Sequence, residues 1–252
     1  MSCFEVIFSP TGGTKKVPHI LAGKLSDRSE CIDLTDPKVD FASFSFAADD
    51  ICLLAVPSFG GRVPAVAAER LRLLRGNGAK AVLVAVYGNR AYEDTLVELQ
   101  DIAENAGFRS IAAVAAVAEH SIMRQFATGR PDADDVRELE RFAEVIRQRA
   151  ESENIPLLDV PGNRPYKEWH SSPMYPETNQ DCCFCGACAA VCPVGAIPLE
   201  NPQKTNTGMC ISCMRCISVC PSHARELKKL LLDGVALKLQ KVCSGRKSNE
   251  LI

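Results

Sequence analysis

The sequence contains no apolar run that approaches the roughly 18 residues of a membrane-spanning helix. Its N-terminus also lacks a charged segment followed by an apolar one, so we expect no secretory signal peptide. These two absences predict a cytoplasmic protein with no membrane span.

Net charge is also small, at −2 over 252 residues. A chain with so little excess charge gives no reason to expect a nucleic-acid partner. The composition, 46% hydrophobic and 24% charged, is that of an ordinary globular protein. Its length is sufficient for one large domain or two smaller ones with real cores.

Cysteine, in contrast, is abundant, with 13 residues. A cytoplasmic chain is kept reduced, so structural disulfides are not expected there. Clustered cysteines in such a chain more often hold metal. Cys3, Cys31, Cys52 and Cys243 are isolated, and we expect them to be ordinary small core residues.

Strand-like and helix-like patterns alternate along the first 155 residues. Apolar runs rich in β-branched residues predict buried parallel strands at 3–8, 51–56, 81–86 and 110–117, with a short fifth strand at 29–34. Amphipathic stretches predict helices at 14–26, 64–75, 92–106 and 132–151. Five strands alternating with helices predict an α/β fold with an open, doubly wound parallel sheet.

The chain is expected to have four parts. Residues 1–155 form the α/β domain, and 156–178 form a proline-rich linker that packs on a surface through Tyr166, Trp169 and Tyr175. A small cysteine-rich domain spans 179–225, and a basic tail spans 226–252.

The stretch "FSPTGGTKK", residues 8–16, joins the first predicted strand to the first helix. Glycines allow a tight turn there, and the amides at the start of a helix point toward an anion. The Walker spacing and G-x-G-x-x-G are both absent. The predicted phosphate-binding residues are Ser9, Thr11, Gly12, Gly13 and Thr14; a glycine-rich turn with no ligand is the alternative.

Two further loops, "PSFGGRVP" (57–64) and "YGNRAYED" (87–94), follow the next strands of the same sheet. Both are expected at the carboxyl edge, beside the first loop, where open α/β sheets bind ligands. Each places aromatic side chains near glycines, which suits a planar flavin ring. The predicted residues are Ser58, Phe59, Gly60, Gly61, Arg62, Tyr87, Gly88, Asn89 and Tyr92, with Arg62 offsetting the charge of a reduced flavin.

An internal repeat contains most of the cysteines. The segments 182–193 and 210–221 both fit C-x2-C-x2-C-x3-C-P, with an offset of 28 residues at all four positions. Eight thiolates in about 40 residues suit two [4Fe–4S] clusters. Zinc is the alternative, but four-cysteine zinc sites usually use two C-x2-C pairs. Cys183 is out of register and is expected to be a non-ligand.

Taken together, these motifs resemble the fusions of a flavodoxin-like domain with a bacterial-type two-[4Fe–4S] ferredoxin that are common in anaerobes, over nearly the whole length. The resemblance implies FMN in the three loops. It also implies that the fourth cysteine of each repeat binds the other cluster. The cluster-one set is then Cys182, Cys185, Cys188 and Cys220, and the cluster-two set is Cys210, Cys213, Cys216 and Cys192.

Three functions are compatible with these motifs. In the first, FMN and two clusters pass electrons to each other and to external redox partner proteins, which makes the chain an electron carrier. In the second, the α/β domain holds no flavin and docks the clusters to a partner. In the third, the flavin reduces a small molecule, although no second nucleotide loop or acid–base pair is evident. His120, beside Glu119, is left without a role.

The tail is basic and amphipathic, with three acids and six bases over residues 226–252. We expect one or two helical turns on either side of Gly234. Its leucines are expected to pack on the α/β domain or the linker, and an anchor to an anionic membrane surface is the alternative.

Overall fold

The computed structural model describes residues 2–152, 156–169 and 172–252. Its main sheet has six strands in the order β2-β1-β3-β4-β5-β8, of which the first five are parallel and β8 is antiparallel to β5. The strands are β1 (Cys3–Ile7), β2 (Ser29–Asp33), β3 (Ile51–Pro57), β4 (Lys80–Tyr87), β5 (Arg109–Val117) and β8 (Glu250–Leu251).

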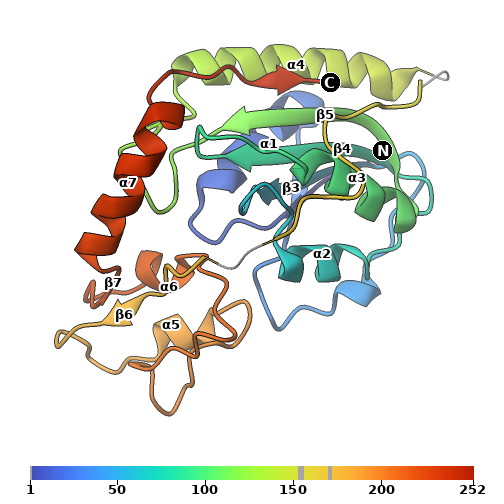
Figure 1. Ribbon diagram of the computed structural model, residues 1–252. Helices are drawn as coiled ribbons and strands as arrows, with labels where there is room; N and C mark the ends of the chain where they lie inside the picture. The colour runs from blue at the N-terminus through green and yellow to red at the C-terminus, as the bar shows by residue number, and fades with distance from the viewer. Residues whose placement is uncertain (1, 153–155, 170–171) are drawn as a thin grey trace.

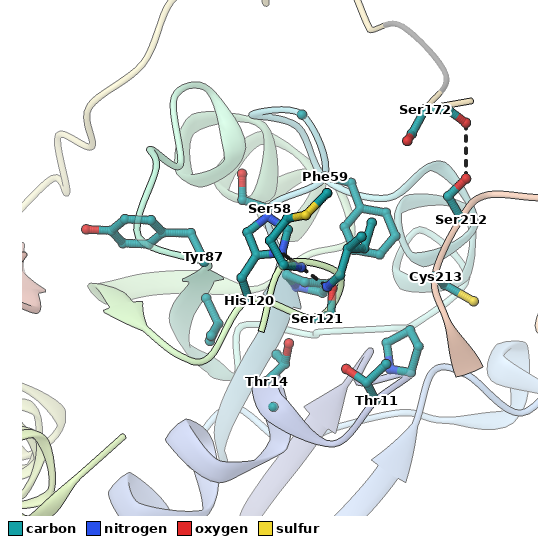
Figure 2. A pocket seen from close by; sticks show the side chains of 18 of the residues that line it. Thr11, Thr14, Ser58, Phe59, Tyr87, His120, Ser121, Ser172, Ser212 and Cys213 are labelled. Carbon is teal, nitrogen blue, oxygen red and sulfur yellow. Dashed lines mark hydrogen bonds between the residues drawn. The ribbon is translucent and has the colours of Figure 1, made fainter. Parts of the chain in front are cut away.

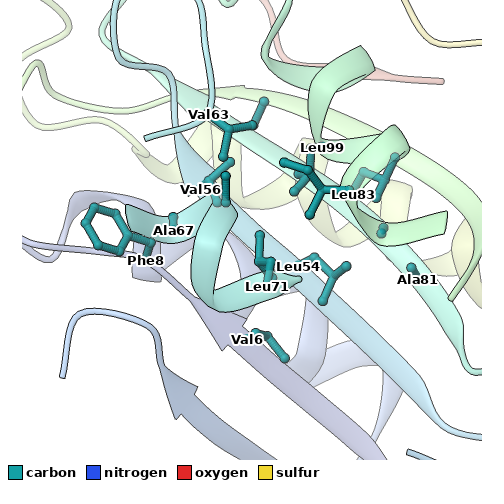
Figure 3. Close-up of a cluster of buried hydrophobic side chains, with 14 of the residues drawn as sticks. Val6, Phe8, Leu54, Val56, Val63, Ala67, Leu71, Ala81, Leu83 and Leu99 are labelled. Atoms are coloured by element: carbon teal, nitrogen blue, oxygen red, sulfur yellow. The ribbon is translucent and has the colours of Figure 1, made fainter. Parts of the chain in front are cut away.

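Helices cover both faces of this sheet (Figure 1). On one face α1 (Gly13–Leu25) and α4 (Ala133–Glu151) pack together on the strands. The other face holds α2 (Ala65–Leu71) and α3 (Thr95–Asn105), whose apolar side chains meet those of β1, β3 and β4 (Figure 3). The parallel order 2-1-3-4-5 is that of a flavodoxin-like sheet. The predicted fold class is therefore confirmed, and its main signal was the apolar runs of the buried strands β1, β3, β4 and β5, since β2 is mostly exposed and β8 was not predicted.

The linker packs along the α/β domain through one buried carboxylate. Asp94 accepts hydrogen bonds from the amide and the side chain of Asn163, both at 2.9 Å, and from the amide of Lys167 at 2.7 Å. Tyr166 donates to Asp101 and lies under the guanidinium of Arg62, 4.7 Å from the ring centroid. The linker is thus a fixed strap along this part of its path.

The cysteine-rich segment repeats its backbone as well as its sequence. The one-turn helices α5 (Ala187–Ala190) and α6 (Arg215–Ser218) lie 28 residues apart. Left-handed backbone also recurs at this offset, in the pairs Phe184 and Ser212, Gly186 and Met214, and Gly195 and His223. The short strands β6 (Glu177–Thr178) and β7 (Arg225–Glu226) pair and close the segment at its base.

The tail differs from its prediction at Gly234. A single helix, α7 (Lys229–Cys243), runs through this residue, so the expectation of separate turns on either side is wrong. Packing supplies the reason, because Leu231, Leu232, Val235 and Leu239 lie on one face of α7 and join a cluster around Met123 and Met214.

After α7 the chain returns to the main sheet, which the sequence did not suggest. Asn249 accepts a hydrogen bond from the amide of Val117 at 2.9 Å and donates to Asp135 and Glu138. The strand β8 that follows completes the sheet edge (Figure 1). The α/β body therefore draws on both ends of the chain. Among the helices that the structure describes, none has the length and apolar character to cross a membrane.

Candidate functional site

A cavity of about 300 Å³ lies at the carboxyl edge of the sheet, and we call it the edge cavity. Its floor comes from the loops after β1, β3, β4 and β5, and its roof comes from the linker, the cysteine-rich segment and α7. The lining residues are Pro10, Thr11, Gly13, Thr14, Pro57–Gly60, Val86–Gly88, Ala118–Met123, Trp169, Ser172, Met174, Ile211–Cys213, Val235 and Leu239. Pockets of this kind, largely apolar with a few placed polar groups, suit small molecules and cofactors.

At one end of the cavity, the β1–α1 loop presents the start of a helix. Gly12 has left-handed backbone with φ of 83°, and α1 begins at the next residue with no acid in its first turn. Thr11, Gly13 and Thr14 line the cavity. Ser9 does not line it; its hydroxyl accepts the amide of Lys15 at 2.9 Å and so braces the loop. The free amides and the hydroxyls of this turn suit an anionic group.

The β3 loop contributes Ser58, Phe59 and Gly60, as predicted for a ring-binding loop. Phe59 and Arg62 close a tight turn by exchanging backbone hydrogen bonds of 3.0 and 3.2 Å. Gly60 and Gly61 both have positive φ in this turn. The hydroxyl of Ser58 accepts a hydrogen bond from the hydroxyl of Thr95 at 2.8 Å, which fixes the Ser58 side chain at the cavity wall.

Four of the predicted flavin residues lie away from the edge cavity. Arg62 forms an ion pair with Glu98 at 2.7 Å and donates to the carbonyl of Lys167 at 2.6 Å, so it braces the linker. It does not line the cavity, and we withdraw it as a partner for a reduced flavin. Gly61 lies against Glu93, and Asn89 and Tyr92 bind the tail.

The tail draws the β4 loop aside. Asn89 donates to the carbonyls of Cys243 and Gly245, both at 2.7 Å, and the hydroxyl of Tyr92 donates to Glu250 at 2.7 Å. Only Tyr87 and Gly88 of the predicted residues in this loop remain at the cavity. Residues 118–123, which follow β5, line the cavity beside them.

His120 in that β5 loop has a fixed tautomer. Its Nδ1 accepts the amides of Ile122 and Met123, both at 3.1 Å, so its proton is on Nε2. Burial, assisted by the charge of Arg90, lowers the pKa of His120 and keeps the ring neutral. The ring packs on Gly88, where a Cβ atom would lie 2.5 Å from its Cδ2. His120 therefore offers a neutral donor at the cavity wall (Figure 2).

The roof joins the edge cavity to the cysteine-rich segment. The hydroxyl of Ser212 donates to the carbonyl of Ser172 at 3.1 Å, which ties the second cysteine loop to the linker (Figure 2). Cys213 lines the cavity beside them, and Figure 2 shows its sulfur turned away from Phe59 and His120. One side of this loop thus faces the cavity and the other carries a thiol of the cluster-two set.

The two cysteine sets occupy separate places. A small hollow is lined by Cys182, Cys185, Cys188 and Cys220, with Cys183 also at its wall. Cys192 lies close enough to Cys210, Cys213 and Cys216 for its charge to act on all three. Burial is the main cause that raises the pKa of the Cys213 thiol to about 11 and that of Cys216 to about 12.

The crossing cysteines receive equivalent hydrogen bonds in the two repeats. The sulfur of Cys192 accepts the amide of Ala196 at 3.3 Å, and that of Cys220 accepts the amide of Ala224 at 3.2 Å. Amide bonds to ligand sulfurs are a known means of setting cluster potentials. All-sulfur donor sets with braced sulfurs fit iron–sulfur clusters. Among the described residues, no three Cys, His, Asp or Glu side chains converge on a single metal ion.

Comparison with known proteins identifies this segment. Residues 175–226 match the family model of the 4Fe-4S dicluster domain. This segment is a 4Fe-4S dicluster domain. The polyferredoxin protein MvhB of Methanothermus fervidus is 35% identical over 63 residues, and that of Methanothermobacter thermautotrophicus is 33% identical over 54. The matches cover 25% and 21% of this chain, and the chain spans only 15% and 13% of the length of these relatives.

Solved structures similar to the first part of the chain include two flavodoxins. The Streptococcus pneumoniae TIGR4 flavodoxin is 22% identical, with 59% of this chain and 99% of that chain covered and a TM-score of 0.43. A flavodoxin from the domain Archaea is 13% identical, covering 60% of this chain and all of that chain, with a TM-score of 0.44. The chain thus combines a flavodoxin-like sheet with a 4Fe-4S dicluster domain.

Sequence reasoning missed the roof of the edge cavity and the β5 loop. His120 was noted in the sequence, and Trp169 was expected to pack on a surface, but no local pattern connects them to the loops after β1 and β3. The residues that the sequence did not assign to a site are Pro10, Pro57, Val86, Ala118–Met123, Trp169, Ser172, Met174, Ile211, Ser212, Val235 and Leu239. The offset-28 repeat was the available signal for Ile211 and Ser212, since it placed them within a cluster-binding loop.

Proposed function

We propose that the protein is an electron carrier that holds FMN in the edge cavity and two [4Fe–4S] clusters in its dicluster domain. It passes electrons between the flavin, the clusters and external redox proteins. The observation that supports this most is the shared wall, because the second cysteine loop lines the same cavity as the phosphate-type loop after β1. FMN exchanges electrons singly or in pairs and each cluster exchanges one, so the chain converts between the two modes.

The residues at the edge cavity fit FMN in kind and in order. Thr11, Gly13 and Thr14 would hold the phosphate at the start of α1. The ring would lie toward Phe59, Gly88 and the neutral Nε2–H of His120. Gly60 keeps backbone close to the cavity without a side chain. The other residues predicted for the flavin do not line the edge cavity, and the proposal does not depend on them: Ser9, Gly12, Gly61, Arg62, Asn89 and Tyr92.

The cluster-two set would be the nearer electron partner of the flavin. Cys213 lies in the cavity wall, whereas the cluster-one set surrounds a separate hollow and includes the exposed Cys185. Phe184 beside it is 59% exposed. Electrons would therefore pass between flavin and cluster two, then cluster one, and exchange with a partner protein at this exposed end.

The roof favours a carrier over a reductase of small molecules. Trp169 and Met174 from the linker and Leu239 from α7 cover part of the cavity. A hydride acceptor needs to stack on the flavin ring, and these side chains occupy the approach. The docking-module alternative has the same sheet and clusters but no flavin.

A cofactor assay under anaerobic conditions tests the proposal. One FMN with about eight iron and eight sulfide per chain is the expected content. Iron with no flavin, even after FMN is added, would support the docking module instead. Fewer than four irons with tightly bound zinc would end the cluster assignment.

A further inference from the structure

The dicluster domain contains one deeply buried arginine whose charge is not balanced by an acid. Arg225 in β7 is 3% exposed. It donates to the hydroxyl of Thr205 at 2.6 Å and to the carbonyls of Lys204, Pro176 and Pro202. All of these acceptors are neutral. In the described ranges Arg225 forms no ion pair with a carboxylate.

A buried charge without a counter-charge is costly, so proteins normally pair it. One donor of Arg225 is also unused, because its buried Nε has no hydrogen-bond partner among the residues that the structure describes. An unpaired charge and an unpaired donor in the same side chain indicate a negatively charged group that the protein atoms do not supply.

The position of Arg225 indicates what that group is. Arg225 lines the hollow of the cluster-one set, and the carbonyl of Pro202 that it binds is also 3.8 Å from the sulfur of Cys188. Its charge is also felt at Cys210 and Cys216 of the cluster-two set. The guanidinium thus lies within electrostatic reach of both cysteine sets.

The repeat shows that the motif itself does not require a cation here. By the 28-residue offset, Arg225 corresponds to Ile197, which is also buried at 5% exposure. An apolar side chain fills this place in one half of the domain and an arginine fills it in the other. The cysteine motif itself therefore does not dictate an arginine at this place.

We propose that Arg225 is a buried cation shared by the two clusters that raises the reduction potential of both. Reduction adds one electron to a cluster and makes no bond, so the added negative charge is stabilised by a fixed positive charge nearby. This inference rests on the proposed clusters but not on the flavin.

The test compares three variants of the full chain by iron analysis and anaerobic potentiometric titration. Arg225→Gln removes the charge and keeps hydrogen-bond donors for the surrounding carbonyls. Arg225→Lys keeps the charge. Lys204→Met removes an exposed charge from the adjacent loop and serves as the control.

We expect Arg225→Gln to retain its iron and to lower the equilibrium constant for reduction of both clusters, by about tenfold, or about 59 mV for a one-electron couple, at the more affected one. In Arg225→Lys and in Lys204→Met, the equilibrium constant for cluster reduction should change by less than threefold. Unchanged potentials in Arg225→Gln with full iron content would overturn the proposal. So would an equal shift in the Gln and Lys variants.

If Arg225→Gln loses its iron, the Lys variant decides. If Arg225→Lys keeps its clusters with near-native potentials, the proposed role of the positive charge is supported. If it loses its clusters, or if the equilibrium constant for reduction shifts by as much as tenfold, that role is refuted. Absence of iron from the unmodified protein would instead refute the proposed clusters, so the two failures are distinct.

Discussion

Changing Asp94 to Ala should release the linker from the α/β domain. Asp94 is 1% exposed and holds the linker through three hydrogen bonds, two from Asn163 and one from the amide of Lys167. The side chain of Asp94 makes no capping hydrogen bond to α3, so the substitution should cost the helix little stability. The change therefore acts on the strap that places Trp169 at the roof of the edge cavity.

The size of the effect follows from the three bonds. A hydrogen bond to a charged acceptor contributes about 1.5–3 kcal/mol, but the released donors regain water when the linker opens. We therefore expect a loss of about 3 kcal/mol in local stability, which makes opening roughly a hundredfold more frequent. Hydrogen exchange of the Lys167 amide measures this opening directly.

The matched control is Asp159→Ala, which removes an exposed acid from the same linker. It should leave exchange at Lys167 within about twofold of the unmodified protein. An increase of less than threefold in Asp94→Ala would refute the idea that this carboxylate fastens the linker.

Lowering the pH should weaken the same contact between Asp94 and the linker. Burial raises the pKa of Asp94, but the hydrogen bonds from Lys167 and Asn163 outweigh it and leave the value below the ordinary 3.8. A carboxyl with a depressed folded-state pKa stabilises the structure above its unfolded pKa and loses that contribution as the pH falls through the folded value. The linker should thus stay docked at pH 5 and open only on acidification below about 4.

Three other substitutions test the site and the tail. Gly88→Ala would place a Cβ atom 2.5 Å from His120, and the resulting strain of about 1–3 kcal/mol should weaken FMN binding about tenfold or more in a fluorescence titration. The control is Gly23→Ala, whose added Cβ atom would meet no atom within 4 Å. Native FMN affinity in Gly88→Ala would contradict the prediction. Asn249→Ala should lower the free energy of unfolding in urea by about 2–3 kcal/mol, because it leaves the amide of Val117 unpaired, whereas Ser248→Ala should change little. Cys182→Ala should lose iron and Cys183→Ala should not, and equal losses would show that the register of the first repeat is wrong.

The sheet was predictable from the sequence because its four central strands are buried on both faces and read as apolar runs. β3, for example, is buried along six of its seven residues. The order of the strands was not predicted, since periodicity does not determine which strands pair. The cysteine repeat was equally visible, because ligand spacing is local.

The edge cavity was predictable only in part, since its geometry depends on contacts between distant segments. Asn89 and Tyr92 have the right residue types and the right loop, but partners more than 150 residues away hold them elsewhere. The same tail brings Val235 and Leu239 to the cavity. Gly234 was misread for a related reason, because the cost of about 1 kcal/mol for a helical glycine is outweighed by the packing of its neighbours on the cluster around Met123.

The return of the chain to the sheet also bears on electron transfer. The dicluster domain enters from the linker, fastened at Asp94, and leaves through α7 to β8, fastened at Asn249. Arg70 binds the carbonyl of Pro193 at 2.7 Å, and Arg215 lies 3.7 Å from Asp33, which adds contacts between the two anchors. A module held at both ends cannot swing away when one contact opens, because the other keeps its local concentration high. The wall that Cys213 forms at the edge cavity is therefore held from both sides, so the relay we propose through it would need no docking step within the chain.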